Sequence, residues 1–94
     1  TWLSNIPALG KCTSLFIDIN DHLYCSLRWN HLVAKYRMKT SLSTFSVVAG
    51  TGFRGSSSSM LSQPYGIFLT TTLDLYVADC GNHRVQLFPS GQTN

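Results

Sequence analysis

The protein has 94 residues and a net charge of +3, and only 12% of its residues are charged. A chain of this length forms at most one domain, and it contains no apolar run of the ~18 residues that a membrane span requires. Glu is absent, whereas Thr, Ser, Val, Gly and aromatic residues are frequent. This composition favours short strands and turns over long helices, so it predicts an all-β fold.

The three cysteines, Cys12, Cys25 and Cys80, are too widely spaced for a zinc site, since no Cys-x-x-Cys pair occurs. Their odd number leaves at least one thiol free. We expect all three to be ordinary buried or half-buried residues, and the alternative is one disulfide between two of them in an oxidising compartment. The compartment stays open, with an extracellular location favoured over a cytoplasmic one.

Residues 1–13 lack periodicity and form an entry segment, after which short apolar runs begin. Two of these runs are joined by Asn20 and Asp21, which are typical of a hairpin turn. The predicted strands of this first unit lie at residues 15–19, 22–26, 32–36 and 44–48. Four such strands in succession predict an antiparallel meander.

The chain contains an internal repeat, which appears when the sequence is shifted by 52 positions against itself. The six identities in register are Phe16/Phe68, Leu23/Leu75, Tyr24/Tyr76, Asn30/Asn82, His31/His83 and Val33/Val85. The second copy predicts three strands, the last two at residues 75–78 and 84–88. A four-stranded antiparallel unit that repeats at this length indicates the blades of a β-propeller.

A Gly- and Ser-rich tract at residues 49–65 separates the two copies. Pro64 disfavours a helix or central strand there, so we expect a loop with one helical turn at residues 58–62. The predicted organisation is an entry segment, a complete first blade, an interblade loop and an incomplete second blade, at residues 1–13, 14–48, 49–65 and 66–94.

The second copy closely resembles the NHL repeat. The matching residues are Pro64-Tyr65-Gly66-Ile67-Phe68-Leu69, followed by Leu75-Tyr76-Val77-Ala78-Asp79-Cys80-Gly81-Asn82-His83-Arg84-Val85-Gln86-Leu87-Phe88. The first copy keeps Asn30 and His31, but Leu27, Trp29 and Leu32 replace the Asp, Gly and Arg of the pattern. The resemblance implies NHL-type propeller blades, one of them complete and the other with three strands.

The same resemblance implies a propeller that is often six-bladed and that binds protein or RNA on a rigid platform, while a minority of such proteins are enzymes. We therefore expect these residues to belong to a larger propeller, which further blades or self-association would close. The expected function is a noncatalytic interaction scaffold that binds protein partners. No association with a membrane is expected. RNA binding is the alternative, and part of a metal-dependent propeller lyase or hydrolase is the second alternative.

Three polar residues of the second copy, Asp79, Asn82 and Arg84, are expected to brace the turn between two strands rather than to act in catalysis. Asp79 can accept N–H groups of the turn, Asn82 tolerates the left-handed region, and Arg84 can reach back to the Asp79 carboxylate or to nearby carbonyls. Because the first copy lacks this Asp and Arg, we expect it to close its turn differently.

A basic surface is the candidate binding site. Lys35, Arg37 and Lys39 alternate along an extended segment and so share one face. The other candidate binding residues are Arg28, Trp29, His31, Arg54 and His83. Cations with aromatic residues can bind phosphates and stack on bases, whereas the simpler interpretation is a solvated strand end whose lysines discourage edge pairing.

Two sequence patterns resemble cofactor or metal sites, and neither predicts a cofactor or a metal. The resemblance includes a lyase branch with a metal in its central channel, but here it explains His31 and His83 as parts of the repeat. Residues 50–55 spell Gly-x-Gly-x-x-Gly, the fingerprint of dinucleotide sites. Such a site needs a substantial helix after the glycines, and the segment that follows is too short and ends at Pro64. No catalytic residues are assigned.

Overall fold

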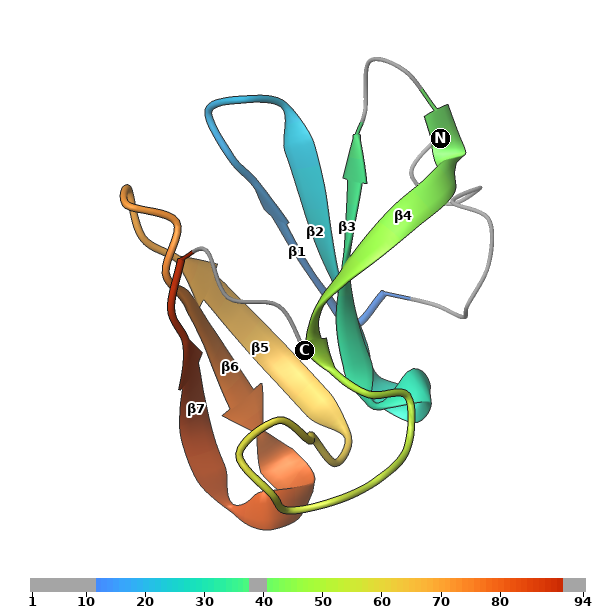
Figure 1. Cartoon of the computed structure of the whole chain (residues 1–94), viewed down its shortest axis with the longest axis vertical. Helices are drawn as coiled ribbons and strands as arrows, with labels where there is room; N and C mark the ends of the chain where they lie inside the picture. The colour runs from blue at the N-terminus through green and yellow to red at the C-terminus, as the bar shows by residue number, and fades with distance from the viewer. Residues whose placement is uncertain (1–11, 38–40, 91–94) are drawn as a thin grey trace.

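Two antiparallel β-sheets lie face to face at an angle in the computed structural model, which describes residues 12–37 and 41–90 (Figure 1). Sheet A has the strand order β1-β2-β3-β4, and sheet B has the order β5-β6-β7. The strands are β1 Ser14–Ile17, β2 His22–Leu27, β3 Leu32–Arg37, β4 Ser41–Gly50, β5 Pro64–Leu69, β6 Leu75–Asp79 and β7 Arg84–Phe88. The predicted all-β architecture, with four strands in one unit and three in the next, is confirmed.

The loop between the sheets is shorter than the sequence predicted. β4 continues to Gly50 and β5 already begins at Pro64, so the interblade loop covers residues 51–63. Pro64 is tolerated because it is the first residue of an edge strand, followed by a register shift between Pro64 and Ile67. The expected helical turn is instead one tight turn, in which the Met60 N–H donates to the Ser57 carbonyl at 3.2 Å.

The first strand also ends earlier than predicted, at Ile17 rather than Ile19. The cause is Asp18, whose Oδ1 accepts the backbone N–H groups of Asn20 at 2.8 Å and of His22 at 2.9 Å. These bonds turn the chain immediately after β1, because a side-chain acceptor at this position replaces strand pairing with a local turn.

The main core lies between the two sheets, and residues from both copies of the repeat build it. Sheet A and sheet B contribute one face each, with Leu61 added from the interblade loop. The buried residues of this core are Tyr24, Val33, Ala49, Leu61, Leu69, Leu75, Val77 and Phe88. Strands β1 and β5 lie next to each other at the centre, where the rings of Phe16 and Phe68 meet edge to face with centroids 5.9 Å apart.

The opposite face of sheet A is buried as well. It holds a second cluster of Leu23, Cys25, Leu27, Leu32, Ala34 and Tyr36, against which Cys12 and Val47 pack. Strand β2 is consequently buried on both faces, whereas the buried residues of β6 alternate with more exposed ones. A strand covered on both sides needs apolar residues at successive positions, which explains the continuous apolar run in the first copy.

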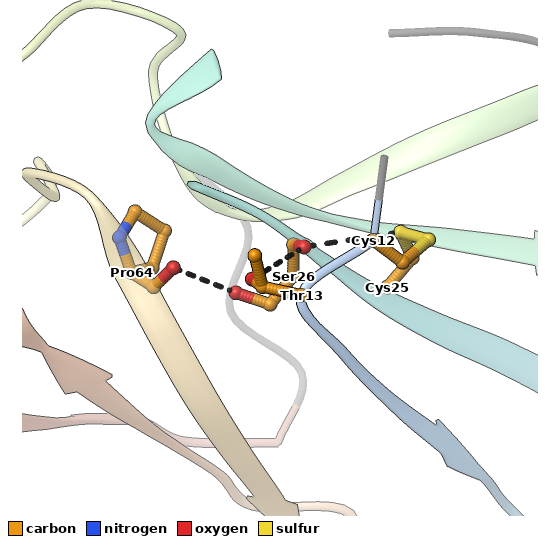
Figure 2. Close-up of a disulfide and its surroundings, with 5 residues drawn as sticks. All are labelled: Cys12, Thr13, Cys25, Ser26 and Pro64. Carbon is orange, nitrogen blue, oxygen red and sulfur yellow. Dashed lines mark hydrogen bonds between the residues drawn. A yellow bond between two sulfur atoms is a disulfide. The ribbon is translucent and has the colours of Figure 1, made fainter. Parts of the chain in front are cut away.

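A disulfide joins Cys12 to Cys25, and the expectation that all cysteines are unpaired is wrong (Figure 2). The chain before β1 is also held by Thr13, whose N–H and hydroxyl both donate to the Ser26 carbonyl, at 2.9 and 3.1 Å. Ser26 in turn donates from its hydroxyl to the Pro64 carbonyl of sheet B at 3.1 Å (Figure 2). Residues 1–11 of the predicted entry segment lie outside the described residues.

Candidate functional site

One end of the two sheets gathers most of the predicted binding residues, and we call it the turn end (Figure 1). It consists of the interblade loop and two short 3-10 turns, η2 at Arg28–Asn30 between β2 and β3, and η3 at Cys80–Asn82 between β6 and β7. We call the opposite end, formed by the β1–β2 and β5–β6 turns, the hairpin end.

The two 3-10 turns have the same backbone form. Each ends at a histidine in the left-handed region, His31 with φ 58° and His83 with φ 55°. The expectation that the first copy closes its turn differently is therefore wrong. The left-handed residue is also the histidine rather than the preceding asparagine. Because the first copy has neither the Asp nor the Arg, these two residues are not needed to form the turn.

Asp79 instead ties the interblade loop to sheet B. Its side chain is fully buried, and its Oδ1 accepts the Ser62 N–H at 2.7 Å. Its Oδ2 accepts from Asn82 Nδ2 and from Arg84 Nε, each at 2.8 Å. Asn82 also donates to the Gly55 carbonyl at 2.8 Å. Ser62 and Gly55, which Asp79 and Asn82 contact outside the 3-10 turn, both belong to the interblade loop.

Arg84 completes this loop brace, by which we mean Asp79, Asn82 and Arg84. Its Nη1 donates to the Ser56 carbonyl at 3.0 Å, and its Nη2 donates to the carbonyls of Ser57 and Met60 at 2.9 and 3.0 Å. A planar guanidinium can hold several carbonyls at once because its donors lie in a fixed fork. These hydrogen bonds thus hold the loop in one conformation at the turn end, although the loop contains no helix or strand.

Gly81 allows the loop to approach η3 closely. Its N–H donates to the Ser62 carbonyl at 2.7 Å, and an added Cβ would overlap that carbonyl oxygen. The equivalent residue of the first copy is Trp29, which cannot fit beneath a loop in this way. Its side chain is 66% exposed at the turn end.

Arg28, Trp29 and Tyr65 form a cation–π cluster on the surface of the turn end. The Arg28 Cζ lies 4.7 Å from the ring centroid of Trp29 and 5.6 Å from that of Tyr65. Tyr65 is 52% exposed, and the Nε of Arg28 is buried without a hydrogen-bond partner among the described residues. The cluster spans both copies, since Tyr65 comes from β5 of sheet B.

Sequence reasoning missed Tyr65 for a physical reason. Regular alternation along β5 places Tyr65 on the same face as Ile67 and the buried Leu69. The register shift between Pro64 and Ile67 breaks this alternation and turns Tyr65 outward. The Gly66 beside it was the only sequence signal, because a glycine within a strand often marks such a bulge.

A polar groove of about 450 Å³ lies beside this cluster. Its lining comes from the interblade loop and η3, and consists of Arg54, Gly55, Ser56, Ser62, Gln63, Gly81 and Asn82. Arg54 is exposed and forms no ion pair among the described residues. His31 connects the groove to the cluster, because its Nδ1 accepts the Gln63 N–H at 3.1 Å. In its neutral form His31 therefore carries its proton on Nε2.

The other predicted cations are not at the turn end. Arg37 pairs with His22 in the sheet register and so lies near the hairpin end, and Lys35 lies on β3 with its Nζ 6.0 Å from the ring of Tyr24. Lys39 is outside the described residues. The predicted basic surface is thus divided, with Arg28, Arg54, His31 and His83 at the turn end.

Neither cofactor pattern of the sequence has a matching arrangement of side chains in the described part of the chain. No group of three His, Cys, Asp or Glu side chains there could hold a metal ion. Gly50 and Gly52 have positive φ and lead into the interblade loop, where no helix begins. A dinucleotide site also uses an acidic residue about 20 positions after the glycines, and Asp74, which follows Gly55 at this distance, lies at the hairpin end. Within residues 12–37 and 41–90, no helix is long and apolar enough to cross a membrane.

The fold and its turn end define a class of protein, that of antiparallel β-propeller blades joined by an interblade loop. Residues 61–88 match the family model of the NHL repeat, a stretch that covers the end of the loop and all of sheet B. Residues 61–88 are therefore an NHL repeat. A comparison with curated proteins finds no match to it.

Proposed function

We propose that the protein is a noncatalytic scaffold that binds protein partners through its turn end. The NHL repeat supports the general role, because such repeats form β-propeller platforms that often mediate protein interaction. The observation that carries the choice of surface is the cation–π cluster, in which Trp29 and Tyr65 are both more than half exposed around Arg28. Trp, Tyr and Arg dominate the binding energy of protein interfaces, because each combines a large contact area with a polar group.

The surroundings of the cluster also favour a binding platform. Phe53 of the interblade loop adds a further exposed aromatic side chain, and the loop brace fixes this loop by hydrogen bonds to Asp79, Asn82 and Arg84. A surface that is ordered before binding loses less conformational entropy in the complex.

Site-specific cross-linking tests this proposal in the full-length protein. A photoreactive amino acid replaces Trp29 in one variant and Ile19, an exposed residue at the hairpin end, in the control. We expect defined protein cross-links from position 29 that are absent from position 19. The proposal is wrong if position 29 gives no protein cross-links or gives the same products as position 19.

RNA binding is the alternative function, and the unpaired arginines of the turn end are the observation that favours it. It predicts an affinity for single-stranded RNA that falls steeply with salt, because phosphate contacts release bound counterions. Fluorescence anisotropy with a labelled single-stranded RNA measures this. An affinity that is lost in an Arg28→Ala, Arg54→Ala double variant would favour RNA over protein as the partner.

A further inference from the structure

The charges of this protein are divided between its two ends. Asp18 and Asp21 lie in the β1–β2 turn and Asp74 lies in the β5–β6 turn, so three of the four aspartates belong to the hairpin end. The fourth, Asp79, is at the turn end but is fully buried and paired with Arg84. The turn end consequently presents no exposed side-chain carboxylate within the described residues.

Two cations of the turn end have no acidic partner among the described residues. Arg54 is exposed at the groove, and Arg28 lies between the two exposed rings. The Arg28 Nε is a buried donor without an acceptor among the described residues, which is unfavourable. An incoming carboxylate would pair with the outer N–H groups of these guanidinium groups and complement the local charge.

We infer that the turn end binds an acidic segment of a partner protein, with carboxylates paired to Arg28 and Arg54 and apolar side chains against Trp29 and Tyr65. This inference rests on the proposed function and specifies the chemistry of the partner. The groove of about 450 Å³, which Arg54 and residues of η3 line, is large enough for side chains of an extended peptide. Its Ser, Gln and Asn lining offers hydrogen bonds to the peptide backbone.

The geometry favours a carboxylate over a nucleic-acid base. The Arg28 guanidinium lies over the rings of both Trp29 and Tyr65, so at most one face of each ring is left for a base to stack on. A guanidinium that is stacked in this way keeps its outer N–H groups available for the paired hydrogen bonds of a carboxylate. Two unpaired arginines are also few for binding to an RNA backbone, which uses many phosphate contacts.

The test uses the full-length protein and a matched pair of fluorescent peptides. The first peptide is rich in Asp, Glu and Leu, and the second has Asn and Gln in place of the acidic residues. We expect fluorescence anisotropy to detect the acidic peptide only, with an affinity that falls as salt is raised because surface ion pairs are screened. Equal binding of the two peptides, or binding of neither, would overturn the inference.

Three variants locate the site. Arg54→Glu and Arg28→Ala are each expected to weaken binding about tenfold, as the loss of a charge-assisted hydrogen bond predicts. The control, Arg37→Ala, removes the same charge from the hairpin end and is expected to leave the affinity unchanged. A loss of equal size in all three variants would contradict the inference, because it would indicate general charge attraction. Arg54 is exposed, so its replacement keeps the test independent of folding.

The outcomes separate this inference from the proposed function. Protein cross-links at position 29 without a preference for the acidic peptide would overturn the acidic partner and leave the scaffold intact. Single-stranded RNA that displaces the labelled acidic peptide at a lower concentration than the unlabelled peptide does would overturn the protein partner in favour of RNA.

Discussion

Asp79 and Arg84 form an ion pair of which the carboxylate is fully buried, with Arg84 Nε 2.8 Å from Asp79 Oδ2. The equivalent residues of the first copy are Leu27 and Leu32, both buried in the second cluster of sheet A. The same fold position thus accepts either a charged pair or two leucines. The difference lies in the interblade loop, which only the charged pair can hold through hydrogen bonds.

Removal of Arg84 alone is expected to be costly. Arg84→Leu leaves the buried Asp79 carboxylate without its counter-charge, which typically lowers the free energy of unfolding by about 3–5 kcal/mol. The double variant Arg84→Leu, Asp79→Leu is expected to recover part of this loss, since the buried charge is then gone, although the Ser62 N–H stays unpaired. Urea unfolding measures both values. A double variant less stable than Arg84→Leu would contradict this explanation.

The ionisation of Asp18 makes the stability of the β1–β2 turn depend on pH. Burial raises the pKa of its carboxyl, but the backbone N–H groups of His22 and Asn20 and the His22 imidazole together outweigh burial and lower the pKa below 3.8. Burial, together with the Asp18 carboxylate, raises the pKa of Tyr24 to about 12, so this phenol keeps its proton at neutral pH. A carboxyl with a lowered pKa in the folded state stabilises the fold only while it is ionised.

The expected pH dependence follows from this sign. The contribution of Asp18 is fully present above 3.8, the pKa of the unfolded state, and is lost as the pH falls through the lower folded pKa. The difference in unfolding free energy between the wild type and Asp18→Asn should therefore shrink as the medium is acidified through this range. Urea unfolding at a series of acidic pH values measures it. A difference that does not change with pH would show that the ionised carboxylate is not the stabilising group.

The disulfide acts at the scale of an element, because it fixes the chain before β1 to the centre of sheet A. Cys25 is fully buried in β2, and Cys12 lies two residues before the start of β1. Cys80 lies in η3 and is free and exposed. Disulfides persist mainly in oxidising compartments, so the bridge is stable only in such surroundings.

Thiol counting and unfolding test the disulfide together. The unreduced, denatured protein should show one reactive thiol, from Cys80, and the Cys12→Ser variant should show two. The bridge closes a chain segment with a sequence separation of 13, so its removal is expected to lower the unfolding free energy by about 3 kcal/mol. Three reactive thiols in the unreduced wild type would contradict the pairing.

At the scale of the whole molecule, the two sheets carry equivalent residues in unequal surroundings. Tyr24 and Val33 of sheet A are buried against sheet B, whereas their equivalents Tyr76 and Val85 lie on the outer face of sheet B and are 40% and 70% exposed. Phe68 and Leu87 flank Tyr76 in the strand register and are exposed on the same face. This outer face of sheet B is apolar, like the face of sheet A that packs against sheet B.

An exposed apolar sheet face favours association, and we expect its occupant to be a further sheet of the same kind. In the isolated chain a second copy takes this place, so light scattering should detect dimers or larger species. Val85→Lys should shift the chain toward the monomer, because the new charge would be buried in the contact. The control Ile19→Lys, at the exposed hairpin end, should not. A wild-type monomer at all concentrations would contradict this expectation.

The sequence alone determined the number and order of the strands, the internal repeat and the NHL repeat of the second copy. Apolar runs and turn residues act over a few neighbours, and the shift of 52 residues placed both copies in one register. The turn end could be predicted only in part. Arg28, Trp29, Arg54 and the histidines were found as residue types, but their grouping, and the separation of Arg37 from them, depended on where each strand ends.

Only the tertiary structure decided which cysteines pair, what Asp79 holds and how Tyr65 reaches Arg28. Each of these joins residues far apart in the chain, and the register shift in β5 that turns Tyr65 outward leaves hardly a trace in the sequence pattern. The structure also decided which of two equivalent faces is exposed. Repeated residues have the same local preferences, but their burial depends on what lies against each sheet, and that is a property of the assembled chain.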